Sequence, residues 1–375
     1  MGTTPSMQAA QHDPSSLPDD ATRSMNMDAL AAIARVLPLG EPDKLCSALF
    51  ESGELAAPLL ASELERIEGA LVRPLRTILD RGGKGFRGGI LEACCTAVGG
   101  DFAPYADWTA LTELLHVGSM IVDDVEDDAQ TRRGGPACHL VHGRAAAINA
   151  GTFAYFVPQR MIQRSALPPS TKLALYEELL GLLRVAHVGQ GLDILSLADS
   201  LCGGASLDEL SAALDTIHRY KSGWAFRTFA RMGAILGGAA PEQVEALGEL
   251  LLLYGIAFQR VDDLLDVTGF LGGYKPRGGD VRAGKVTYPL LCALRRLPHT
   301  QRVELRQAFA EVRNDEPRVD RVLNMIVASG AVEAGFEETQ RMTDSAWAAL
   351  GDDVVDEAGR ARLREFTALM IQRVY

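Results

Sequence analysis

Three aspartates lie close together where an apolar stretch ends, in the sequence IVDDVED. On a helix Asp123 and Asp127 share one face, because residues four apart are neighbours, and Asp124 lies about 100° round. Carboxylates this close repel one another unless a hard divalent cation such as Mg²⁺ bridges them, and Mg²⁺ keeps positions open for substrate phosphates. Arg132 and Arg133 follow, with forked donors that suit phosphate. The stretch predicts a site for a metal and a diphosphate.

A second aspartate cluster, FQRVDDLLD, has nearly the same spacing, with Asp262, Asp263 and Asp266. It also follows an apolar run, and Lys275 and Lys285 come after it. Clustered carboxylates in an apolar setting need metal ions or cationic partners. Two such clusters with basic followers, on facing helices, predict a clamp around one polyanion.

The composition is that of an ordinary globular chain with a strong helical bias. Of its 375 residues, 47% are hydrophobic, 23% charged and 6% aromatic, and Ala and Leu are abundant. The formal net charge of −12 argues against nucleic acid as a partner, since binding to phosphate backbones needs a basic surface. The partners that the sequence favours are small phosphorylated substrates.

The cysteine pattern and the hydropathy favour a reducing, aqueous compartment. Six cysteines occur without a C-x-x-C pair, so free thiols are expected. The sequence contains no run of about 18 apolar residues, so a transmembrane helix is not expected. The N-terminus resembles neither a signal peptide nor a transit peptide, which predicts a cytoplasmic protein.

The patterning predicts one all-α domain with an N-terminal extension. Residues 1–25 are polar and contain prolines, which favours disorder, and weak periodicity over 26–58 predicts accessory helices. Residues 59–375 show helical apolar spacing, with Pro74 marking a kink or a break. Helices near both aspartate clusters are apolar on most faces, so a helical bundle around a central cavity is expected. The main predicted helices span 88–98, 106–129, 144–165, 170–199, 207–237, 241–268 and 286–297.

Other polar stretches are ambiguous by themselves. Lys84 and Arg87 in RGGKGFRGG could form a phosphate-binding turn before a helix, but a flexible basic turn explains them better. Gln190 and Asp193 in HVGQGLDI either bond each other or line a cavity. His116 lies two turns before the first aspartate, and both a substrate contact and a core histidine stay open.

Taken in order along the chain, these motifs resemble those of the trans-isoprenyl diphosphate synthases, also called polyprenyl synthetases. GGKGFR is similar to the family's substrate-phosphate turn, and DDVEDDAQTRRG to its first aspartate-rich motif. GQGLD, YKSG, FQRVDDLLD and KPRGGDVRAGKVTYP correspond to later motifs. The resemblance runs from about residue 60 to the C-terminus and is strongest to geranylgeranyl diphosphate synthases. It implies the isoprenoid-synthase helical fold and, by analogy, a homodimer.

The resemblance also implies roles for individual residues. Three Mg²⁺ ions would bind with the allylic diphosphate at Asp123, Asp127 and Asp262, supported by Asp124, Asp263 and Asp266. The allylic diphosphate would contact Arg132, Lys221, Lys275 and Lys285, and the isopentenyl diphosphate would contact Lys84, Arg87, His116 and Arg133. Ser222 and Gln259 would face the developing cation. An allylic cation forms in a dry cavity, isopentenyl diphosphate attacks it, and proton loss to the released diphosphate completes the longer chain.

Product length depends on side chains one turn before the first aspartate, where the growing tail runs along the helix. Gly118 and Ser119 stand there, and both are small. A C15 product needs a bulky aromatic stop at that point, so C20 or longer is expected, with geranylgeranyl diphosphate favoured. Leu115, another turn down, or neighbouring helices would close the cavity.

Two other interpretations stay open. A terpene cyclase of the same superfamily ionises its substrate in the same way but needs no second diphosphate. Loss of the second aspartate cluster, or of Lys84 and Arg87, would indicate a cyclase, and all are present. A non-catalytic subunit that shifts a partner's product length is the other interpretation, and the intact first motif argues against it.

Overall fold

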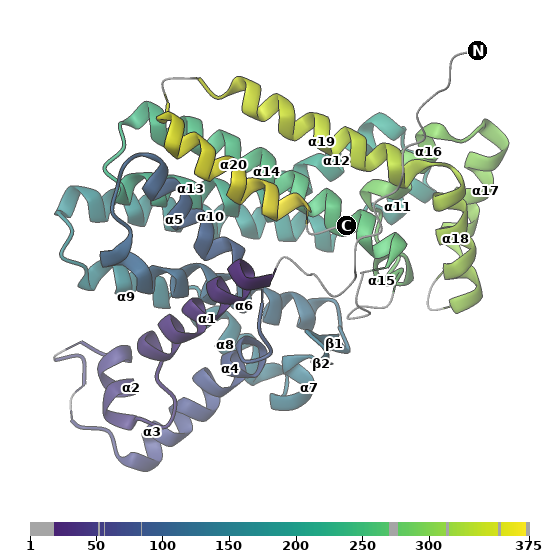
Figure 1. Ribbon diagram of the computed structural model, residues 1–375. Coiled ribbons are helices and arrows are strands. Elements are labelled where there is room, and N and C mark those ends of the chain that lie inside the picture. Colours follow the sequence, from purple (N-terminus) through teal and green to yellow (C-terminus); the bar gives the residue numbers. More distant parts are fainter. Residues whose placement is uncertain are drawn as a thin grey trace.

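The computed structural model describes residues 19–51, 53–55, 57–83, 85–269, 277–312, 315–351 and 354–372. Two predicted diphosphate-binding residues, Lys84 and Lys275, lie outside these ranges. Within them the chain forms helices joined by short loops, with one small antiparallel sheet (Figure 1). The predicted all-α fold class is confirmed.

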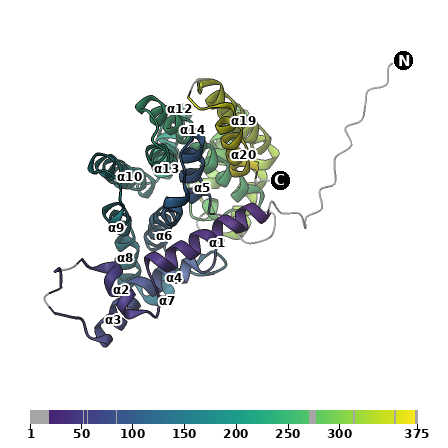
Figure 2. The same ribbon diagram turned by 60° about the vertical axis from the view of Figure 1, so that its left-hand side comes forward.

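The N-terminal helix α1 (Asp19–Val36) packs on the main body. It lies across α6 (Thr109–Glu126), and its buried Ile33 joins a core that includes Leu114 and Ile121 of α6 (Figure 2). α1 begins inside residues 1–25, for which the sequence predicted disorder, and residues 1–18 lie outside the described ranges. Packing on the main body stabilises the later part of α1, and a helix that has formed adds residues at its N-terminus at little cost. This explains why α1 begins before the predicted end of the disordered segment.

A short group of helices follows α1 and includes a π-helical segment. The π-helix η1 comes just before Pro74, which has no N–H to donate to a regular helical ladder. The sequence predicted a kink or break at this proline, and the structure shows a local widening of the helix. These elements are α2 (Pro42–Leu49), α3 (Ala61–Ile67), η1 (Glu68–Val72) and α4 (Arg73–Leu79).

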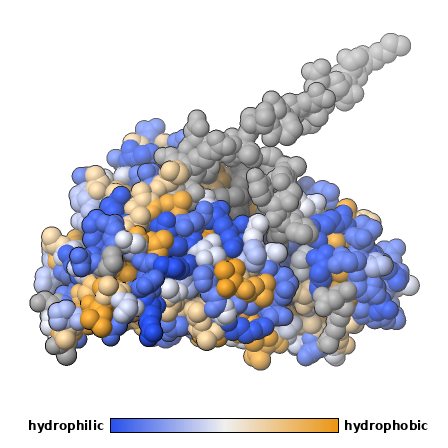
Figure 3. Space-filling view, turned by 90° about the horizontal axis from the view of Figure 1, so that it is seen from below, coloured by the Kyte–Doolittle hydropathy of each residue, from blue (hydrophilic) through white to orange (hydrophobic). Residues whose placement is uncertain are grey.

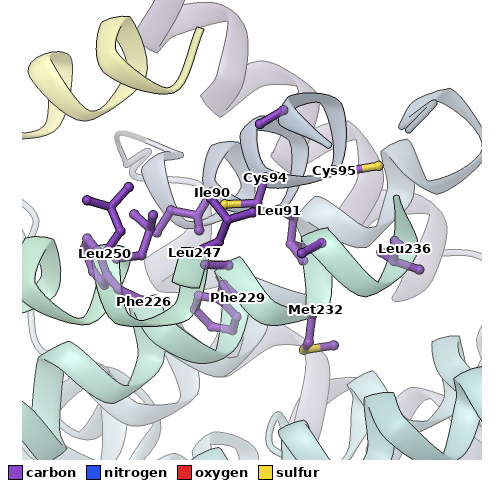
Figure 4. Packing of buried hydrophobic residues seen from close by; sticks show 14 of the residues in the cluster. Ile90, Leu91, Cys94, Cys95, Phe226, Phe229, Met232, Leu236, Leu247 and Leu250 are labelled. Carbon is purple, nitrogen blue, oxygen red and sulfur yellow. The ribbon is translucent and has the colours of Figure 1, made fainter. Parts of the chain in front are cut away.

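The centre of the molecule is a bundle of long helices. α5 (Phe86–Ala97), α13 (Trp224–Leu236) and α14 (Pro241–Thr268) pack side by side, with α10 (Pro169–Ile194) next to α13 (Figure 2). Their buried side chains interdigitate, for example Ile90 and Leu91 with Phe226, Phe229 and Leu247 (Figure 4). Burying each such side chain stabilises the fold by about 1.5–3 kcal/mol.

Short elements connect the central helices and bring the polar motifs to one end of the bundle. Thr131 pairs with Pro136 and Arg132 with Gly135 in the sheet. The connecting elements are η2 (Ala103–Trp108), β1 (Thr131–Arg132), β2 (Gly135–Pro136), α7 (Cys138–His142), α8 (Arg144–Phe153), α9 (Val157–Arg164), α11 (Ala198–Cys202), α12 (Leu207–Ile217) and η3 (His218–Gly223).

The C-terminal helices form a second core beside the first, built around Leu290, Leu305, Leu323 and their neighbours. Seen from below, the surface is mainly hydrophilic and its hydrophobic residues gather in separate small groups (Figure 3). None of the described helices is long and apolar enough to cross a membrane. The C-terminal elements are α15 (Gly279–Arg282), α16 (Tyr288–Arg296), α17 (His299–Ala310), α18 (Glu316–Ala328), α19 (Ala331–Ala349) and α20 (Glu357–Gln372).

Candidate active site

The first aspartate cluster lies at the C-terminal end of α6. Asp123 is in the last turn and Asp127 is the C-cap, where its N–H donates to the carbonyl of Asp123 at 2.9 Å. Their side chains are 23% and 35% exposed, so both carboxylates are accessible from outside the bundle. The predicted sharing of one helix face is consistent with their lysine partners, both of which also contact Asp193.

Two lysines from distant parts of the chain meet this carboxylate pair. Lys221 Nζ lies 3.0 Å from Oδ1 of Asp123 and 2.6 Å from Oδ2 of Asp193. Lys285 Nζ lies 2.6 Å from Oδ2 of Asp127 and 3.7 Å from Oδ2 of Asp193. Burial opposes ionisation of Asp123, but attraction by Lys221 and Lys285 holds its pKa below the ordinary value. The structure therefore brings together two sequence-predicted lysines and two predicted metal ligands.

A close helix contact fixes the position of Lys221. Gly189 of α10 packs directly on the backbone of η3. A Cβ atom at residue 189 would lie 2.5 Å from the backbone nitrogen of Lys221. Only glycine allows this approach. The next residue of α10 is Gln190, whose Nε2 donates to Asp123 Oδ1 at 2.8 Å and to Glu126 Oε2 at 2.6 Å. The contact places the polar residues of α10 against the end of α6.

A hydrogen-bonded chain runs from η3 to the second aspartate cluster. Ser222 Oγ donates to Gln259 Oε1 at 2.8 Å, and Gln259 Nε2 donates to Asp263 Oδ1 at 3.0 Å. Asp263 is buried and also accepts from the backbone N–H of Tyr288 at 3.1 Å and faces His218 Nε2 at 3.4 Å. Burial alone would raise the pKa of Asp263, but His218 and these donors hold it below its ordinary value.

The other aspartates of the second cluster differ in environment. Asp262 is half-buried on α14, on a different side of the helix from buried Asp263. Asp266 is 1% exposed, and its carboxylate accepts from the N–H groups of Gly279 at 3.2 Å and Asp280 at 3.0 Å. Asp266 thus caps α15. Its assignment as a metal ligand stays a prediction.

Asp124 and Arg132 form an ion pair that the sequence did not reveal. Arg132 Nε lies 2.9 Å from Asp124 Oδ1, Nη2 also contacts that oxygen, and Asp124 is fully buried. The chain turns between the end of α6 and β1, where Asp128 has a left-handed backbone with φ of 52°, and this turn allows the contact. Arg81 Nη1 secures the hairpin by donating to the carbonyls of Arg132 at 2.8 Å and Pro136 at 2.7 Å. Both paired residues were predicted as direct ligands, and in the structure each contacts the other.

The residues predicted to bind isopentenyl diphosphate lie near one another where they are described. Burial, together with the charges of Arg87, Arg133 and Arg132, holds the pKa of His116 well below its ordinary value. The same charges oppose the effect of burial on Glu113, whose pKa is raised. Arg133 adopts a left-handed backbone with φ of 50°, a conformation rare outside glycine. A histidine whose pKa is lowered by three neighbouring arginines marks a locally positive region that suits an anion.

The predicted chain-length residues have unequal surroundings. Gly118 packs against α8, where a Cβ atom would lie 2.5 Å from the Gly151 carbonyl oxygen. Ser119 is exposed and donates to the His116 carbonyl, while Leu115 is buried in the main core. Small size at residue 118 therefore has a packing cause. Their control of product length stays a prediction.

Tyr155 was missed by sequence reasoning. Its ring lies edge-on to His187, with centroids 5.6 Å apart, and its Cε1 atom is 3.4 Å from where a Gly118 Cβ would stand. Burial and the charges of Glu126 and Asp123 raise the pKa of Tyr155. An aromatic side chain thus stands beside α6, close to the aspartate cluster, just after α8, which packs closely on α6 at Gly118 and Gly151. No motif marks it in the sequence.

The sequence offers two interpretations of Gln190 and Asp193, and the structure gives both residues partners at the first aspartate cluster and its lysines. Gln190 bonds Asp123 and Glu126, while Asp193 pairs with Lys221 and Lys285. The i, i+3 spacing of two polar residues within the apolar α10 was the available signal.

The donor set fits a divalent cation that arrives with a diphosphate. Asp123, Asp127 and Asp262 offer hard oxygen ligands, yet no three His, Cys, Asp or Glu side chains gather closely enough to hold an ion in the described part of the chain. Mg²⁺ typically takes one or two carboxylates and completes its octahedron with water and phosphate oxygens. The residues present fit that pattern.

Comparison with known proteins agrees with this geometry. The polyprenyl synthetase family model matches residues 68–326, so the chain belongs to that family. It is 34% identical over 257 residues to farnesyl diphosphate synthase of Geobacillus stearothermophilus, covering 66% of this chain and 84% of the relative. It is 33% identical over 263 residues to the chloroplastic geranylgeranyl pyrophosphate synthase 11 of Arabidopsis thaliana, covering 68% and 69%.

A solved structure extends the similarity to nearly the whole chain. The crystal structure of geranylgeranyl pyrophosphate synthase from Corynebacterium glutamicum, complexed with isoprenyl diphosphate and magnesium, matches with a TM-score of 0.77 at 25% identity. The match covers 93% of this chain and 99% of that one.

Proposed function

We propose that the protein is a Mg²⁺-dependent trans-prenyltransferase that condenses isopentenyl diphosphate with an allylic diphosphate and releases a C20 prenyl diphosphate. The observation that carries the proposal is the position of η3 between the two aspartate-bearing helices. Its Lys221 reaches Asp123 on α6, and its next residue, Ser222, reaches Gln259 on α14. Cationic and neutral polar groups are thereby placed side by side, as ionisation of an allylic diphosphate requires.

Each group has a definite task in the proposed reaction. Mg²⁺, three ions per site, draws negative charge from the leaving diphosphate when bound. Asp123, Asp127 and Asp262 hold the metal side of the diphosphate. Lys221 and Lys285, already gathered at those carboxylates, donate to diphosphate oxygens and stabilise the negative charge that develops on them.

The neutral pair Ser222 and Gln259 faces the carbon side of the breaking bond. Their oxygen atoms carry no formal charge, so they stabilise a cation by their dipoles without capturing it. Gln259 is held by Asp263, which fixes its amide orientation. Asp263 and Asp266 act as supports, and Asp124 acts by orienting Arg132.

Isopentenyl diphosphate is assigned to the neighbouring Arg87, His116 and Arg133, together with Lys84. The low pKa of His116 keeps the ring neutral, so that it contributes a hydrogen bond while the arginines supply charge. The double bond of isopentenyl diphosphate attacks the allylic cation, and the released diphosphate accepts the proton.

The product length proposed is C20. The tail grows from the aspartate cluster along α6, past exposed Ser119 towards Tyr155 and the buried Leu115. Tyr155 supplies the aromatic bulk that residues 118 and 119 lack. It stands on a neighbouring segment, so the tail is stopped from the side.

Product analysis of the purified chain tests these assignments. The protein is incubated with Mg²⁺, isopentenyl diphosphate and either dimethylallyl, geranyl or farnesyl diphosphate, and the products are identified by mass spectrometry. A C20 diphosphate is expected. A hydrocarbon or alcohol formed without consumption of isopentenyl diphosphate would identify a cyclase, and inactivity with every primer would identify a partner-dependent subunit.

A homodimer in the cytoplasm completes the proposal. One side of α10 carries exposed apolar side chains, which suit a subunit interface and are costly in water. They are Leu173, Leu180, Val188, Leu192 and, at the C-cap, Leu195. Sedimentation should give twice the chain mass for the native protein, and Leu180→Glu should shift the equilibrium towards monomer.

A further inference from the structure

A surface cavity of about 560 Å³ lies away from the aspartate clusters, between the α11–α12 loop and helices α16 and α17. It is lined by residues 204–208 and by Arg295, Arg302 and Arg306. α12 separates this cavity from η3, and its 11 residues span about 16 Å. The cavity is therefore distinct from the candidate active site.

Two of its arginines have few partners. Arg302 Nη2 donates to the Leu297 carbonyl at 3.3 Å, and Arg306 Nη2 donates to the Ala205 carbonyl at 3.2 Å. The Nε atoms of both are buried and have no hydrogen-bond partner. Within the described residues neither arginine forms an ion pair with a carboxylate. Each guanidinium therefore keeps unused donors.

The positive charge of the cavity is only partly balanced. Arg302 and Arg306 lie one turn apart on α17, where like charges repel each other. Arg295 is the one cavity arginine with a carboxylate partner, Asp208, at 3.0 Å, and the Asp208 side chain is 91% exposed. Glu304, between the two α17 arginines, turns away to pair with Arg321 at 2.6 Å. The chain has a net charge of −12, so a cavity lined by three arginines is a positively charged region on a negatively charged protein.

The first turn of α12 adds to this field. Its N-terminus borders the cavity, and the backbone N–H groups there carry partial positive charge. Ser206 caps the helix by accepting from Glu209 N at 3.2 Å, and the Glu209 carboxylate accepts from Ser206 and does not line the cavity. An anion in the cavity would face arginine forks and a helix N-terminus.

We propose that this cavity is a second anion site, for a small phosphorylated ligand of the inorganic phosphate or diphosphate class. Guanidinium forks bind phosphoryl oxygens in pairs, and two forks one turn apart match two linked phosphoryl groups. The lining has no aromatic residue to stack on a base, and Leu207 is its only large apolar side chain. Nucleotides and prenyl tails therefore find no complementary surface, whereas inorganic diphosphate does.

Calorimetric titration of the full chain with sodium diphosphate, in the absence of divalent cations, tests the proposal. Under these conditions the metal-dependent site contributes least. One diphosphate per chain is expected, bound more tightly than inorganic phosphate. Arg302→Gln combined with Arg306→Gln should weaken diphosphate binding at least tenfold. Arg341→Gln, which removes one positive charge from the exposed face of α19, should leave it unchanged.

Two further measurements separate this site from the active site. The double variant should keep its melting temperature and its prenyl-transfer rate, while Lys221→Ala should lose prenyl transfer and keep the cation-free binding of diphosphate. Unaltered binding in the double variant would overturn the proposal. Loss of binding in Lys221→Ala, or equal displacement of diphosphate by sulfate, would also overturn it, whatever the fate of the proposed activity.

Discussion

Lys221 Nζ lies 3.0 Å from Asp123 Oδ1, although 98 positions separate the two residues in the chain. The contact joins η3 to the end of α6. Burial disfavours both charges, yet each stabilises the other, so the pKa of Lys221 is raised and that of Asp123 is lowered. Both groups stay ionised at neutral pH, ready to exchange this contact for metal and phosphate partners.

Asp123→Asn should reduce kcat by about 10²–10³-fold, because it removes both a charged oxygen ligand and the partner of Lys221. Asp128→Asn is the matched control, since Asp128 is more exposed and pairs with Arg144. Steady-state assays with geranyl and isopentenyl diphosphates measure the effect. A change of less than threefold in Asp123→Asn would remove Asp123 from the metal site.

Arg132→Gln should lower the free energy of unfolding by about 3 kcal/mol, because it leaves the buried Asp124 carboxylate without its partner. This is the lower end for broken buried pairs, since the Arg132 side chain is 33% exposed. Arg144→Gln breaks an exposed pair and should change stability by about 0.5 kcal/mol or less. Urea unfolding compares the two. Equal free energies of unfolding in the two variants would show that the Asp124–Arg132 pair does not stabilise the fold.

His116 should make stability depend on pH. The pKa of His116 in the folded protein lies below the ordinary value of 6.5. Between the two pKa values the histidine is protonated in the unfolded state and neutral in the folded state. Stability from this group is therefore present above pH 6.5 and is lost as the pH falls below it, by at most about 1.4 kcal/mol per pH unit. Urea unfolding from pH 5 to 8 should show that slope in the wild type and lack it in His116→Asn. Parallel profiles would contradict the assignment.

Gly118→Ala should destabilise the fold by about 1–3 kcal/mol, because the new Cβ collides with the Gly151 carbonyl oxygen and separates α6 from α8. Ser119→Ala, the adjacent small residue, is exposed and should be nearly neutral. Thermal unfolding of both variants distinguishes a packing role from a chain-length role. If both are equally stable, the contact between α6 and α8 tolerates a methyl group.

Tyr155→Ala should shift the products beyond C20, because it opens the space beside α6. Phe156→Ala removes an exposed neighbouring ring and should leave product length unchanged. Chromatography of the dephosphorylated products after long incubation with farnesyl diphosphate gives the distribution. An unchanged distribution in Tyr155→Ala would place the end of the cavity at Leu115 or deeper.

The long helices could be predicted because their apolar spacing repeats over many turns. The pattern over 241–268 became α14 with the same limits, and that over 207–237 became α12, η3 and α13 as one continuous run. The pattern over 144–165 was read as one helix but is divided into α8 and α9 ahead of Pro158. The apolar pattern does not reveal a break of three residues when the helices on both sides keep the same apolar spacing.

The site was predictable in its residue types but only partly in their partners. Both aspartate clusters could be proposed because clustered carboxylates in apolar surroundings need metal ions or cationic partners, whereas the role of Lys221 was implied only by the resemblance to polyprenyl synthetases. The pairing of Asp124 with Arg132 depends on a chain reversal, and that of Lys285 with Asp127 spans 158 positions. Neither leaves a local pattern. Tyr155 was missed because its place depends on Gly118 and Gly151 meeting.

The π-helical form of η3 lets this part of the chain hold one extra residue without disturbing the helix that follows. A π-helix holds one more residue per turn than an α-helix would over the same rise. Deleting a single residue between His218 and Gly223 would let this segment close to a regular α-helical turn, so Phe226 and Phe229 of α13 would keep their place in the core. The loss would instead move Lys221 and Ser222 relative to their partners on α6 and α14.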